Sequence, residues 1–508
     1  MNSIGESVGL HWFRKDLRIH DNRALLKSIE LCSLLIPLYI LDTEYLSPSY
    51  RGVNYQSWIL DTLRCLNDEL RAKGSRLFVV IGNPIDVLFS VINKFKVKTI
   101  TWERDTEPYN KDIDDRLFDM CRDDFIEAHR FWGHTLYDPD YLLKLGEGAA
   151  PLTMTGFLNI IALAGPPLKP VAAPSTVPGP PPDIYCGDIF ETIPTLSDLK
   201  SYGYNPLDKT TKFVAGEKEA FRRMEKFLAQ RQRVATFDKP KTNPTSLEPD
   251  TTALSPYISR GSLSTRYFHS KILEALGECS DSTRPILKGS LEGQLYWREM
   301  AYLIGYSTPN FNQMVGNPVC KQIPWLEGKE AKVLLHKWEM GKTGYPAIDA
   351  AMNQLRIDGW VHHLGRHLVA CFLTRGDLWV HWELGRDIFN RYLLDSDWSI
   401  TNFSWHWLSC SAFFHQYFRC YGPTTFFKRT DQTGAYVRKF VPILKNYPEN
   451  YIYEPWKAPI EVQEAAGCII GKDYPMPVVD HDVESKRNMG KMRMAYLNAQ
   501  LLNLNFMY

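Results

Sequence analysis

A proline-rich stretch divides the chain into two parts with different patterns. Residues 164–183 read AGPPLKPVAAPSTVPGPPPD. Proline fixes its own φ angle and has no amide hydrogen to donate, so this stretch cannot continue a helix or enter the middle of a sheet. We expect it to run as an extended connector, and we place the boundary between two domains there.

Before this connector, short apolar runs alternate with amphipathic ones, which is typical of an α/β fold. The strand candidates are residues 8–13, 34–41, 76–82, 97–103 and, as a weaker run, 125–129. Between the second and third candidates, apolar residues recur at helical spacing, at Trp58, Ile59, Leu63, Leu66 and Leu70. We therefore predict a mostly parallel, Rossmann-like sheet covered by helices. No G-x-G-x-x-G follows the first run, so the usual dinucleotide site is not expected there.

After about residue 195 the apolar residues follow the period of a helix, as in EKEAFRRMEKFLAQRQ and AIDAAMNQLRIDGWVHHLGRHLVACFL. This part is therefore predicted to be all-α. We divide the chain into an α/β domain over residues 1–138, an extended connector over residues 139–199 and a helical domain over residues 200–508.

The overall charge excludes a protein that binds nucleic acid through bulk electrostatics. The 59 basic and 58 acidic residues leave a net charge of +1, so any contact with DNA needs a local patch. The ten cysteines are scattered singly, which indicates thiols in a reducing compartment. There is no secretory signal and no apolar run that could span a bilayer. We expect a nuclear or cytoplasmic protein without membrane association.

Charged residues in the second part mark a candidate cofactor site. Arg366, Asp395 and Asp397 lie in aromatic-rich segments, where buried charges need partners. A guanidinium facing one carboxylate, with a second carboxylate accepting from a ring N–H, would suit a buried flavin ring. A structural ion pair explains these residues equally well. The hydroxyls of TTALS, residues 251–255, could hold a diphosphate at a helix start, although alone they fit an ordinary N-cap better.

Eight segments of the chain form a larger pattern. They are HWFRKDLRIHDN, TTALSPY, EGQLYWRE, GNPVCKQIPW, GYPAIDAAMNQLR, GWVHHLGRHLVACFLTRGDLW, LLDSDWS and FHQYFRCYGP. Together they resemble the motifs of the photolyase and animal cryptochrome family, in that family's order, over nearly the whole chain. The resemblance implies an N-terminal α/β domain and a helical domain that binds FAD in a folded, U-shaped form.

The resemblance assigns cofactor roles to single residues. The phosphates would be held by Thr251, Thr252, Leu254 and Ser255. The cavity would be lined by Gln294, Trp297 and Arg298. The isoalloxazine would be held by Arg366, Asp395 and Asp397.

Two positions depart from the family's pattern. Thr401 stands where photolyases have an asparagine that is expected to face flavin N5. A threonine hydroxyl lacks the paired donor and acceptor of an amide, so the reduced flavin could be stabilised differently, and Asn402 is a candidate substitute. Gly365 stands where the family has alanine, at a cost of about 1 kcal/mol in a helix interior. Closer helix packing would explain it.

Four tryptophans match the family's electron-transfer chain. The resemblance implies that electrons pass along them in the order Trp405, Trp382, Trp338, Trp379. Trp379 and Trp382 are three residues apart and share one helical face. On spacing alone, packing in the core would be the better interpretation.

His363 and His367 are four residues apart, so on a helix they point to the same side. Imidazole is the natural proton donor near neutral pH. Leu364 stands where a zinc pair of this spacing has glutamate, and no third ligand is evident, so no metal site is predicted. In (6-4) photolyases the matching histidines flank the lesion and one protonates it, whereas many cryptochromes keep both.

The segment FDKPKTNPTSLEPD, which contains Lys239, resembles the repair enzymes more than the cryptochromes. A lesion must leave the duplex to reach a buried flavin, and aromatic side chains such as Trp297 and Tyr421 would receive it, next to Gln294. Phosphates could contact Lys239, Lys241, Arg419, Lys428, Arg429, Arg438 and Lys439. These residues also fit an ordinary solvated surface.

Two functions are therefore consistent with the sequence. The first is blue-light-driven repair of (6-4) photoproducts in UV-damaged DNA by electron transfer from FAD, with His363 or His367 as the acid. The alternative is a cryptochrome that acts as a photoreceptor or clock regulator through protein partners. We expect a monomer. An antenna chromophore, either an 8-hydroxy-deazaflavin or a methenyltetrahydrofolate, stays open.

Overall fold

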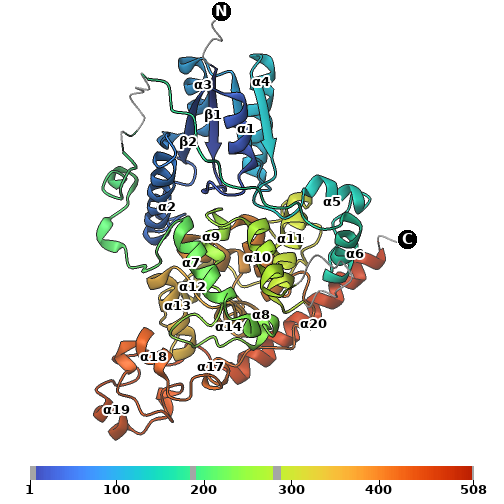
Figure 1. Cartoon of the computed structure of the whole chain (residues 1–508). Helices are drawn as coiled ribbons and strands as arrows, with labels where there is room; N and C mark the ends of the chain where they lie inside the picture. The colour runs from blue at the N-terminus through green and yellow to red at the C-terminus, as the bar shows by residue number, and fades with distance from the viewer. Residues whose placement is uncertain (1–6, 183–189, 191, 278–287, 506–508) are drawn as a thin grey trace, which may run out of the picture. The chain divides into compact units, whose positions relative to one another are not determined.

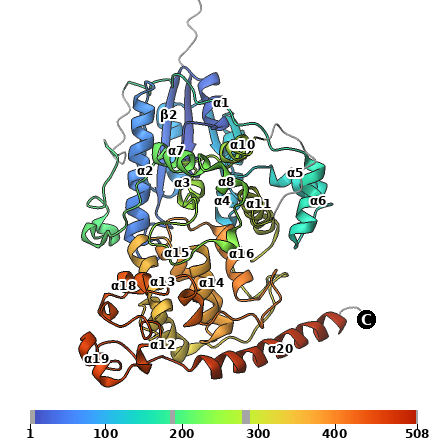
Figure 2. The same ribbon diagram turned by 60° about the horizontal axis from the view of Figure 1, so that its bottom comes forward.

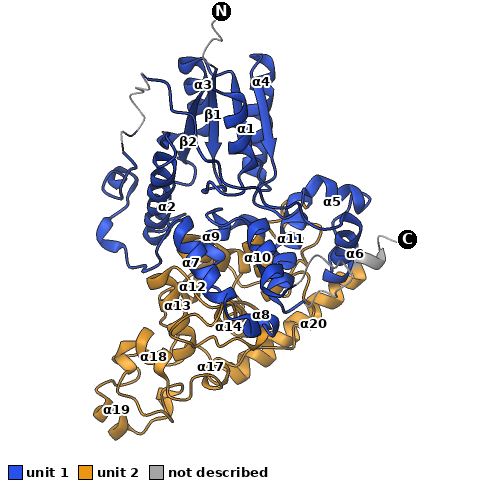
Figure 3. Ribbon diagram, viewed as in Figure 1, with its two compact units in different colours: residues 1–239, 252–307, 394–399 blue, residues 240–251, 308–393, 400–508 orange. Residues whose placement is uncertain are grey.

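The fold comes from a computed structural model, which describes residues 7–182, 190, 192–277 and 288–505. The chain divides into two compact units, shown in Figure 3. Unit 1 comprises residues 1–239, 252–307 and 394–399, and unit 2 comprises residues 240–251, 308–393 and 400–508. This division follows compactness, so the domain boundaries predicted from the sequence stay predictions.

Five parallel strands form a sheet in unit 1, in the order β3-β2-β1-β4-β5. The strands are β1 (Val8–Phe13), β2 (Leu34–Asp42), β3 (Phe78–Gly82), β4 (Thr99–Glu103) and β5 (Glu127–Phe131). In the central strand, Leu10 pairs with Ile36 on one side and with Ile100 on the other. All five predicted strands are confirmed, although β3, β4 and β5 each begin two residues later than predicted.

Helices flank this sheet, as Figure 1 shows for β1 and β2. They are α1 (Arg23–Leu31), α2 (Val53–Arg71), α3 (Pro84–Phe95) and α4 (Pro108–Asp123). Two of them start at asparagine N-caps, because Asn22 accepts from the backbone of α1 and Asn83 accepts from that of α3. Strands β1, β2 and β4 are buried because helices cover the sheet, which is why apolar residues predominate in β1 and β2.

The rest of the described chain is helical. Unit 1 also contains α5 (Pro139–Leu145), α6 (Met154–Ala164), η1 (Lys200–Tyr202), η2 (Pro206–Asp208), α7 (Glu217–Leu228), α8 (Arg231–Ala235), α9 (Ser255–Ser259), α10 (Thr265–Ala275) and α11 (Leu291–Ser307). The short η3 (Lys239–Lys241) stands where the units divide, and α16 (Trp398–Leu408) begins in unit 1 and continues in unit 2. The proline-rich residues 165–182 contain neither helix nor strand, and Asp183 lies outside the described residues. The prediction of an extended connector over residues 139–199 is wrong for residues 139–164, because the side chains of Asp138 and Thr153 cap α5 and α6 there.

Unit 2 contains the helices that carry the histidines and tryptophans of interest. They are α12 (Gly328–Glu339), α13 (Pro346–Asp358), α14 (His363–Cys371), the π-helical turn η4 (Phe372–Gly376), α15 (Trp382–Tyr392), α17 (Thr425–Lys428), α18 (Ala435–Phe440), η5 (Pro442–Leu444), η6 (Pro455–Lys457), α19 (Ile460–Ala466) and α20 (His481–Asn505). Figure 2 shows α20 as a long helix near the end of the chain. The predicted fold class, an α/β part followed by an all-α part, is confirmed.

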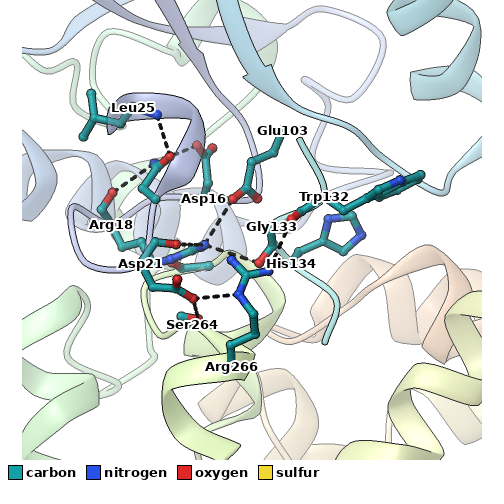
Figure 4. A network of polar contacts seen from close by, with 12 residues as sticks. Asp16, Arg18, Asp21, Leu25, Glu103, Trp132, Gly133, His134, Ser264 and Arg266 are labelled. Atoms are coloured by element: carbon teal, nitrogen blue, oxygen red, sulfur yellow. Dashed lines mark hydrogen bonds and ion pairs between the residues drawn. The ribbon is translucent and has the colours of Figure 1, made fainter. Parts of the chain in front are cut away.

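A buried network of charges joins the sheet to the helices of unit 1 (Figure 4). Arg18 contacts Glu103 at the end of β4, with 3.1 Å between Nη2 and Oε1. Arg266 on α10 contacts Asp21, with 3.0 Å between Nε and Oδ2, and Ser264 donates to the same carboxylate. Burial alone would raise the pKa of Asp21, but the charges of Arg266 and Arg18 hold it below its usual value. The network therefore keeps a buried carboxylate ionised.

Close backbone contact supports the same junction. Gly261 has a φ of +76°, and a Cβ added there would lie 1.8 Å from the carbonyl oxygen of Lys15. Leu17 donates its backbone N–H to Arg260 O at 3.2 Å, and Arg18 Nη1 donates to Gly261 O at 3.1 Å. A glycine is required at position 261 because any side chain would collide with the segment that follows β1.

None of the helices within the described ranges is both long and apolar enough to cross a lipid bilayer.

The junction gives a first testable prediction. Replacing Arg266 with methionine removes the partner of a buried carboxylate, and we expect the free energy of unfolding to fall by about 3–5 kcal/mol. Replacing Arg122, whose side chain is 66% exposed and pairs with Asp119, should cost less than about 1 kcal/mol. Urea unfolding of both variants measures the difference. Equal losses would show that the network does not stabilise the junction.

Candidate functional site

The part of the candidate cofactor site in unit 1 centres on α11. Arg298 contacts Glu299 at 3.1 Å and donates to the hydroxyl of Tyr302 at 3.3 Å, with its guanidinium carbon 4.5 Å from the Tyr302 ring centroid. Its Nε is buried and has no acceptor among the described residues. A buried donor is costly without a partner, so Arg298 suits a ligand that offers an oxygen or a ring nitrogen. This donor is the structural feature that fits a flavin nucleotide.

Asp397 is anchored by other residues of unit 1. Tyr302 donates its hydroxyl to Asp397 Oδ2 at 2.7 Å, and Lys15 Nζ lies 3.4 Å from the same oxygen. Lys15 also contacts Asp105, 2.8 Å away. The Asp397 side chain is completely buried, so these contacts compensate a charge that water cannot reach. They fix the position of a carboxylate that the sequence assigned to the isoalloxazine.

The hydroxyl-rich run is shaped by its own backbone. Leu254 is the N-cap of α9 and makes no side-chain cap bond, so an ordinary N-cap does not account for the hydroxyls. Leu254 N donates to Thr252 Oγ1 at 3.4 Å, and Ala253 between them has a φ of +48°. Ser255 at the start of α9 is exposed. Thr251, the first residue of the run, belongs to unit 2.

Gln294 and Trp297 also lie on α11 and are both half-buried. Gln294 donates its amide to Lys288 O at 2.9 Å, so this interaction orients its side chain toward the start of the helix. Arg366 belongs to unit 2, whereas Asp395 and Asp397 belong to unit 1. Arg366 Nε donates to Val361 O at 2.9 Å. The predicted pairing of Arg366 with the two carboxylates stays a prediction.

In unit 2, α14 presents the two predicted histidines together. The rings of His363 and His367 are 5.8 Å apart and perpendicular. His367 Nδ1 lies 3.1 Å from the hydroxyl of Tyr421. His362 caps the helix, because its Nδ1 accepts from Leu364 N at 3.1 Å. The structure therefore brings His363, His367 and Tyr421 into one group.

Sequence reasoning missed the residue that positions Tyr421. The buried Arg375, just after α14, donates to Tyr417 O at 2.8 Å and to Arg419 O at 3.0 Å. Its Nη1 also lies 3.6 Å from Cys420 Sγ. Arg375 therefore fixes the segment that leads to Tyr421. The signal was visible in the sequence as a lone arginine beside the apolar run VACFL.

Gly365 faces side chains inside unit 2. A Cβ added there would lie 3.0 Å from Val361 Cγ2 and 3.6 Å from Phe427 Cζ. The first distance is tight, so Val361, just before α14, explains a small residue at this position. Phe427 on α17 is at ordinary contact distance, so the predicted closer packing between helices is not the reason.

Among the described rings of unit 2, two pairs of tryptophans are in contact with each other. Trp338 and Trp405 lie with ring centroids 6.4 Å apart, and Trp325 lies 4.7 Å from Trp379. The ring of Trp382 contacts no other tryptophan that the structure describes and lies 4.6 Å from His406. The prediction that Trp379 and Trp382 share one helical face is wrong, because Trp379 precedes α15 and has a φ of +56°. The predicted order places Trp338 third, yet its ring contacts the first residue of that order. Trp325, within the quoted motif GNPVCKQIPW, was not assigned an electron-transfer role.

Glycine sets the environment of Trp405. A Cβ at Gly385 on α15 would lie 2.3 Å from Trp405 Cη2, so only glycine leaves room for the ring. Thr401 and Asn402 lie one turn earlier on α16, and both are buried. Asn402 Oδ1 accepts from Arg386 Nη1 at 3.4 Å. Arg386 on α15 therefore orients the side chain of Asn402, the residue suggested as a substitute for the family's asparagine beside the flavin.

The basic residues predicted to meet phosphates differ in their surroundings. Arg438 donates to Thr433 O at 3.2 Å, to Tyr447 O at 2.7 Å and to Lys445 O. These backbone contacts make it a structural residue of unit 2. The exposed members of the set in unit 2 are Lys241, Arg419, Lys428, Arg429 and Lys439. Lys239, in unit 1, is half-buried and donates its backbone N–H to Gly289 O at 3.0 Å.

A cavity of about 110 Å³ opens where β1, β2 and β4 of unit 1 end. Its walls include Tyr39, Tyr45, Arg51, Glu107 and Arg260. The carboxyl ends of parallel strands are the usual place for a ligand in such a fold. Among the residues that the structure describes, no group of three or more His, Cys, Asp or Glu side chains could hold a metal ion.

Known proteins resemble the chain over nearly its full length. The profile of DNA photolyase matches residues 9–175, and that of the FAD-binding domain of DNA photolyase matches residues 290–494. The chain is 44% identical to a (6-4)DNA photolyase of Arabidopsis thaliana, over 96% of this chain and 89% of that protein. It is 43% identical to Cryptochrome-2 of Gallus gallus, over 96% and 83%.

Among solved structures, a cryptochrome of Synechocystis sp. PCC6803 is similar, with a TM-score of 0.81 and 25% identity. The similarity covers 96% of this chain and 100% of that one. The match to the FAD-binding domain confirms the predicted cofactor.

The anchoring of Asp397 gives a second prediction. Replacing Tyr302 with phenylalanine removes a hydrogen bond to a buried carboxylate, and we expect the free energy of unfolding to fall by about 1.5–3 kcal/mol. The control is Tyr306→Phe on the same helix, since Tyr306 donates to Asp140, whose side chain is 48% exposed. That change should cost about 0.5–1.5 kcal/mol. Urea unfolding measures both variants. Equal losses in the free energy of unfolding would show that the hydrogen bond from Tyr302 to Asp397 contributes no more than an exposed one.

Proposed function

The chain belongs to the photolyase and cryptochrome family, and we propose that it is a (6-4) DNA photolyase, which repairs (6-4) photoproducts under blue light. The observation that carries this proposal is the group formed by His363, His367 and Tyr421 on one side of α14. Two imidazoles beside a phenol are suited to moving a proton onto a bound lesion. The similarity to the Arabidopsis (6-4)DNA photolyase supports the same assignment.

Bound FAD would supply the absorption of blue light and the one-electron chemistry. The protein would hold it through the hydroxyls of Thr252 and Ser255, the guanidinium of Arg298 and the carboxylates of Asp395 and Asp397. Thr251, Arg366, Thr401 and Asn402 stay the further cofactor residues that the family resemblance implies. Arg298 is the best supported of these residues, because its buried Nε needs an acceptor.

We assign the proton transfer to His367 through its contact with Tyr421. If Tyr421 donates to Nδ1, neutral His367 carries its proton on Nε2. Nε2 is then the atom from which the lesion would be protonated. His363, with its ring perpendicular to that of His367, would orient the lesion or share the proton.

We propose that the tryptophans supply electrons in the order Trp405, Trp382, Trp325, Trp379. Trp325 takes the third place because its ring contacts that of Trp379. Trp338 contacts Trp405 instead and would act as a packing partner of the first donor. These four residues are called the relay below.

The substrate would be UV-damaged DNA, with its phosphates met by the exposed basic residues of unit 2 and the lesion by Tyr421 of the same unit. Lys239, Gln294 and Trp297 stay candidates from the family resemblance. The cavity at the strand ends is the candidate place for an antenna chromophore, an 8-hydroxy-deazaflavin or a methenyltetrahydrofolate. A nuclear or cytoplasmic location belongs to the same proposal.

A second candidate function is that of a cryptochrome without repair activity. It is favoured by Thr401, which replaces the asparagine expected beside the flavin, and by the 43% identity to Cryptochrome-2 of Gallus gallus. Repair of lesion-bearing DNA distinguishes the two functions directly.

The proposal predicts that the FAD-loaded protein restores normal pyrimidines in (6-4) DNA under blue light. His367→Asn should slow repair by about 100-fold or more, because a positioned acid contributes on that order. His336→Asn, at an exposed position on α12, is the control and should leave repair unchanged. Chromatography of the DNA products measures the rate. Loss of light dependence, or no repair by fully reduced protein, would exclude the enzyme and favour the cryptochrome.

The relay gives a separate prediction. Trp325→Phe should slow the light-driven reduction of bound FAD severalfold, because the contact with Trp379 is lost. Trp338→Phe should slow it less, since Trp338 lies outside the proposed order. Absorbance of the flavin during illumination measures both. A larger effect of Trp338→Phe would restore the order expected from the sequence.

A further inference from the structure

Trp382, the second member of the relay, lies against a buried cation. Its side chain is fully buried at the start of α15. The guanidinium carbon of Arg386, one helical turn later, is 5.4 Å from the centroid of the indole ring. Arg386 itself is only 9% exposed. A permanent positive charge therefore faces a residue that must carry a positive charge whenever it gives up an electron.

The position of this guanidinium is fixed from several directions. Its Nε donates to Asp387 Oδ1 at 2.9 Å, and its Nη1 donates to Asn312 O and lies 3.4 Å from Asn402 Oδ1. The Asp387 side chain is 58% exposed, so water weakens the field of that carboxylate. Asp387 therefore offsets the positive charge of Arg386 on the side that faces solvent more than on the side that faces the Trp382 ring.

Beside Trp382 the structure describes two histidines and the carboxylate of Glu383, and the carboxylates of Glu383 and Glu327 both act on His381. His406 lies with its ring 4.6 Å away, and burial lowers its pKa to about 4, so it is neutral at pH 7. His381, with its ring 6.0 Å away, also has a lowered pKa because of burial. The carboxylate of Glu383 accepts from the backbone of Met314 at 2.6 Å. The Nε1 of Trp382 is buried and has no acceptor among the described residues.

The same contact has opposite effects on the two oxidation states of Trp382. A cation is attracted to the face of a neutral indole by the ring quadrupole. Once the indole has lost an electron it is positively charged, and the cation repels it. Burial makes this repulsion stronger than it would be in water. Arg386 therefore stabilises Trp382 before electron transfer and destabilises it afterwards.

We propose that Arg386 limits the supply of electrons through the relay by raising the free energy of oxidised Trp382. In this step, one electron leaves Trp382 and restores Trp405, which has itself been oxidised by light-excited FAD. The positive charge moves from Trp405 to Trp382, no bond breaks and no proton moves. Arg386 opposes that movement and favours the return of the charge to Trp405. The inference rests on the proposed function only in taking Trp405 and Trp382 as electron donors to FAD.

Trp379 offers a comparison inside the same unit. Lys491 Nζ lies 4.8 Å from the Trp379 ring centroid, so a second cation faces the last member of the relay. Lys491 is exposed, however, and its field is screened by water and salt. Salt should therefore weaken the effect of Lys491 and leave that of Arg386 largely intact.

The test uses the FAD-loaded full chain with Arg386→Met, Arg386→Lys and the control Arg391→Met. Arg391 is on the same helix but pairs with Glu339. Laser flash absorption measures the yield and lifetime of oxidised tryptophan. We expect Arg386→Met to raise both severalfold, at low salt and at 1 M salt alike. Arg386→Lys and Arg391→Met should behave like the unchanged protein. Lys491→Met should show a smaller gain that 1 M salt removes.

The direction of the change separates electrostatics from damage. A merely structural arginine would, when replaced, lower the stability, the FAD content and the radical yield together, so FAD content and urea unfolding are measured on each variant. An unchanged or lower yield in Arg386→Met with full FAD content would overturn the proposal, as would a gain in Arg386→Lys equal to that in Arg386→Met.

Repair by chemically reduced protein bypasses the relay and should be the same in Arg391→Met and Lys491→Met as in the unchanged protein; the Arg386 variants are judged by the tryptophan signals, because Arg386 also contacts Asn402. Absence of repair in every variant would count against the proposed function, while the tryptophan signals would still decide the role of Arg386.

Discussion

The pairing of charges that water cannot reach is the constraint on which unit 1 depends. The segment after β1 carries Lys15, Arg18 and Asp21 into the interior, and each of them meets a partner from a distant part of the sequence. Isolated, any of these charges would be prohibitively costly to bury. Together they hold the sheet against α10. Lys15, in the same segment, also contacts Asp397. The position of a candidate cofactor residue is therefore set by the junction that organises the unit.

Much of this fold could be predicted from the sequence, and the reason is physical. Strands buried by helices are mostly apolar, so β2 is visible as a nearly continuous run, while β1 and β4 also bury His11, Thr101 and Glu103. The starts of β3, β4 and β5 were each predicted two residues too early, because the residues before a strand can continue its pattern without pairing in the sheet. The proline-rich residues 165–182 were predicted correctly because proline excludes regular structure, whereas α5 and α6 within the predicted connector were missed. The division into compact units was beyond the sequence, since it depends on which distant segments pack together.

The candidate site was predictable in its chemistry and less so in its contacts. Helical periodicity is enough to place His363 and His367 on one side of α14, because that relation is local. Which tryptophan rings meet depends on how separate helices pack, so spacing could not choose between Trp325 and Trp338. The partners of Arg375 and Arg386 were hidden for the same reason, because each belongs to a segment outside its own helix.

The absence of a side chain at Gly385 determines where the ring of Trp405, the proposed first electron donor, can lie. The Trp405 ring occupies the space where every other amino acid would have a Cβ, so the indole touches the helix backbone directly. The rate of electron tunnelling depends steeply on the distance between donor and acceptor. The rate of the proposed first step, from Trp405 to FAD, would therefore depend on the absence of a Cβ at Gly385. Any attempt to retune this photochemistry by enlarging side chains on α15 would have to begin elsewhere on the helix.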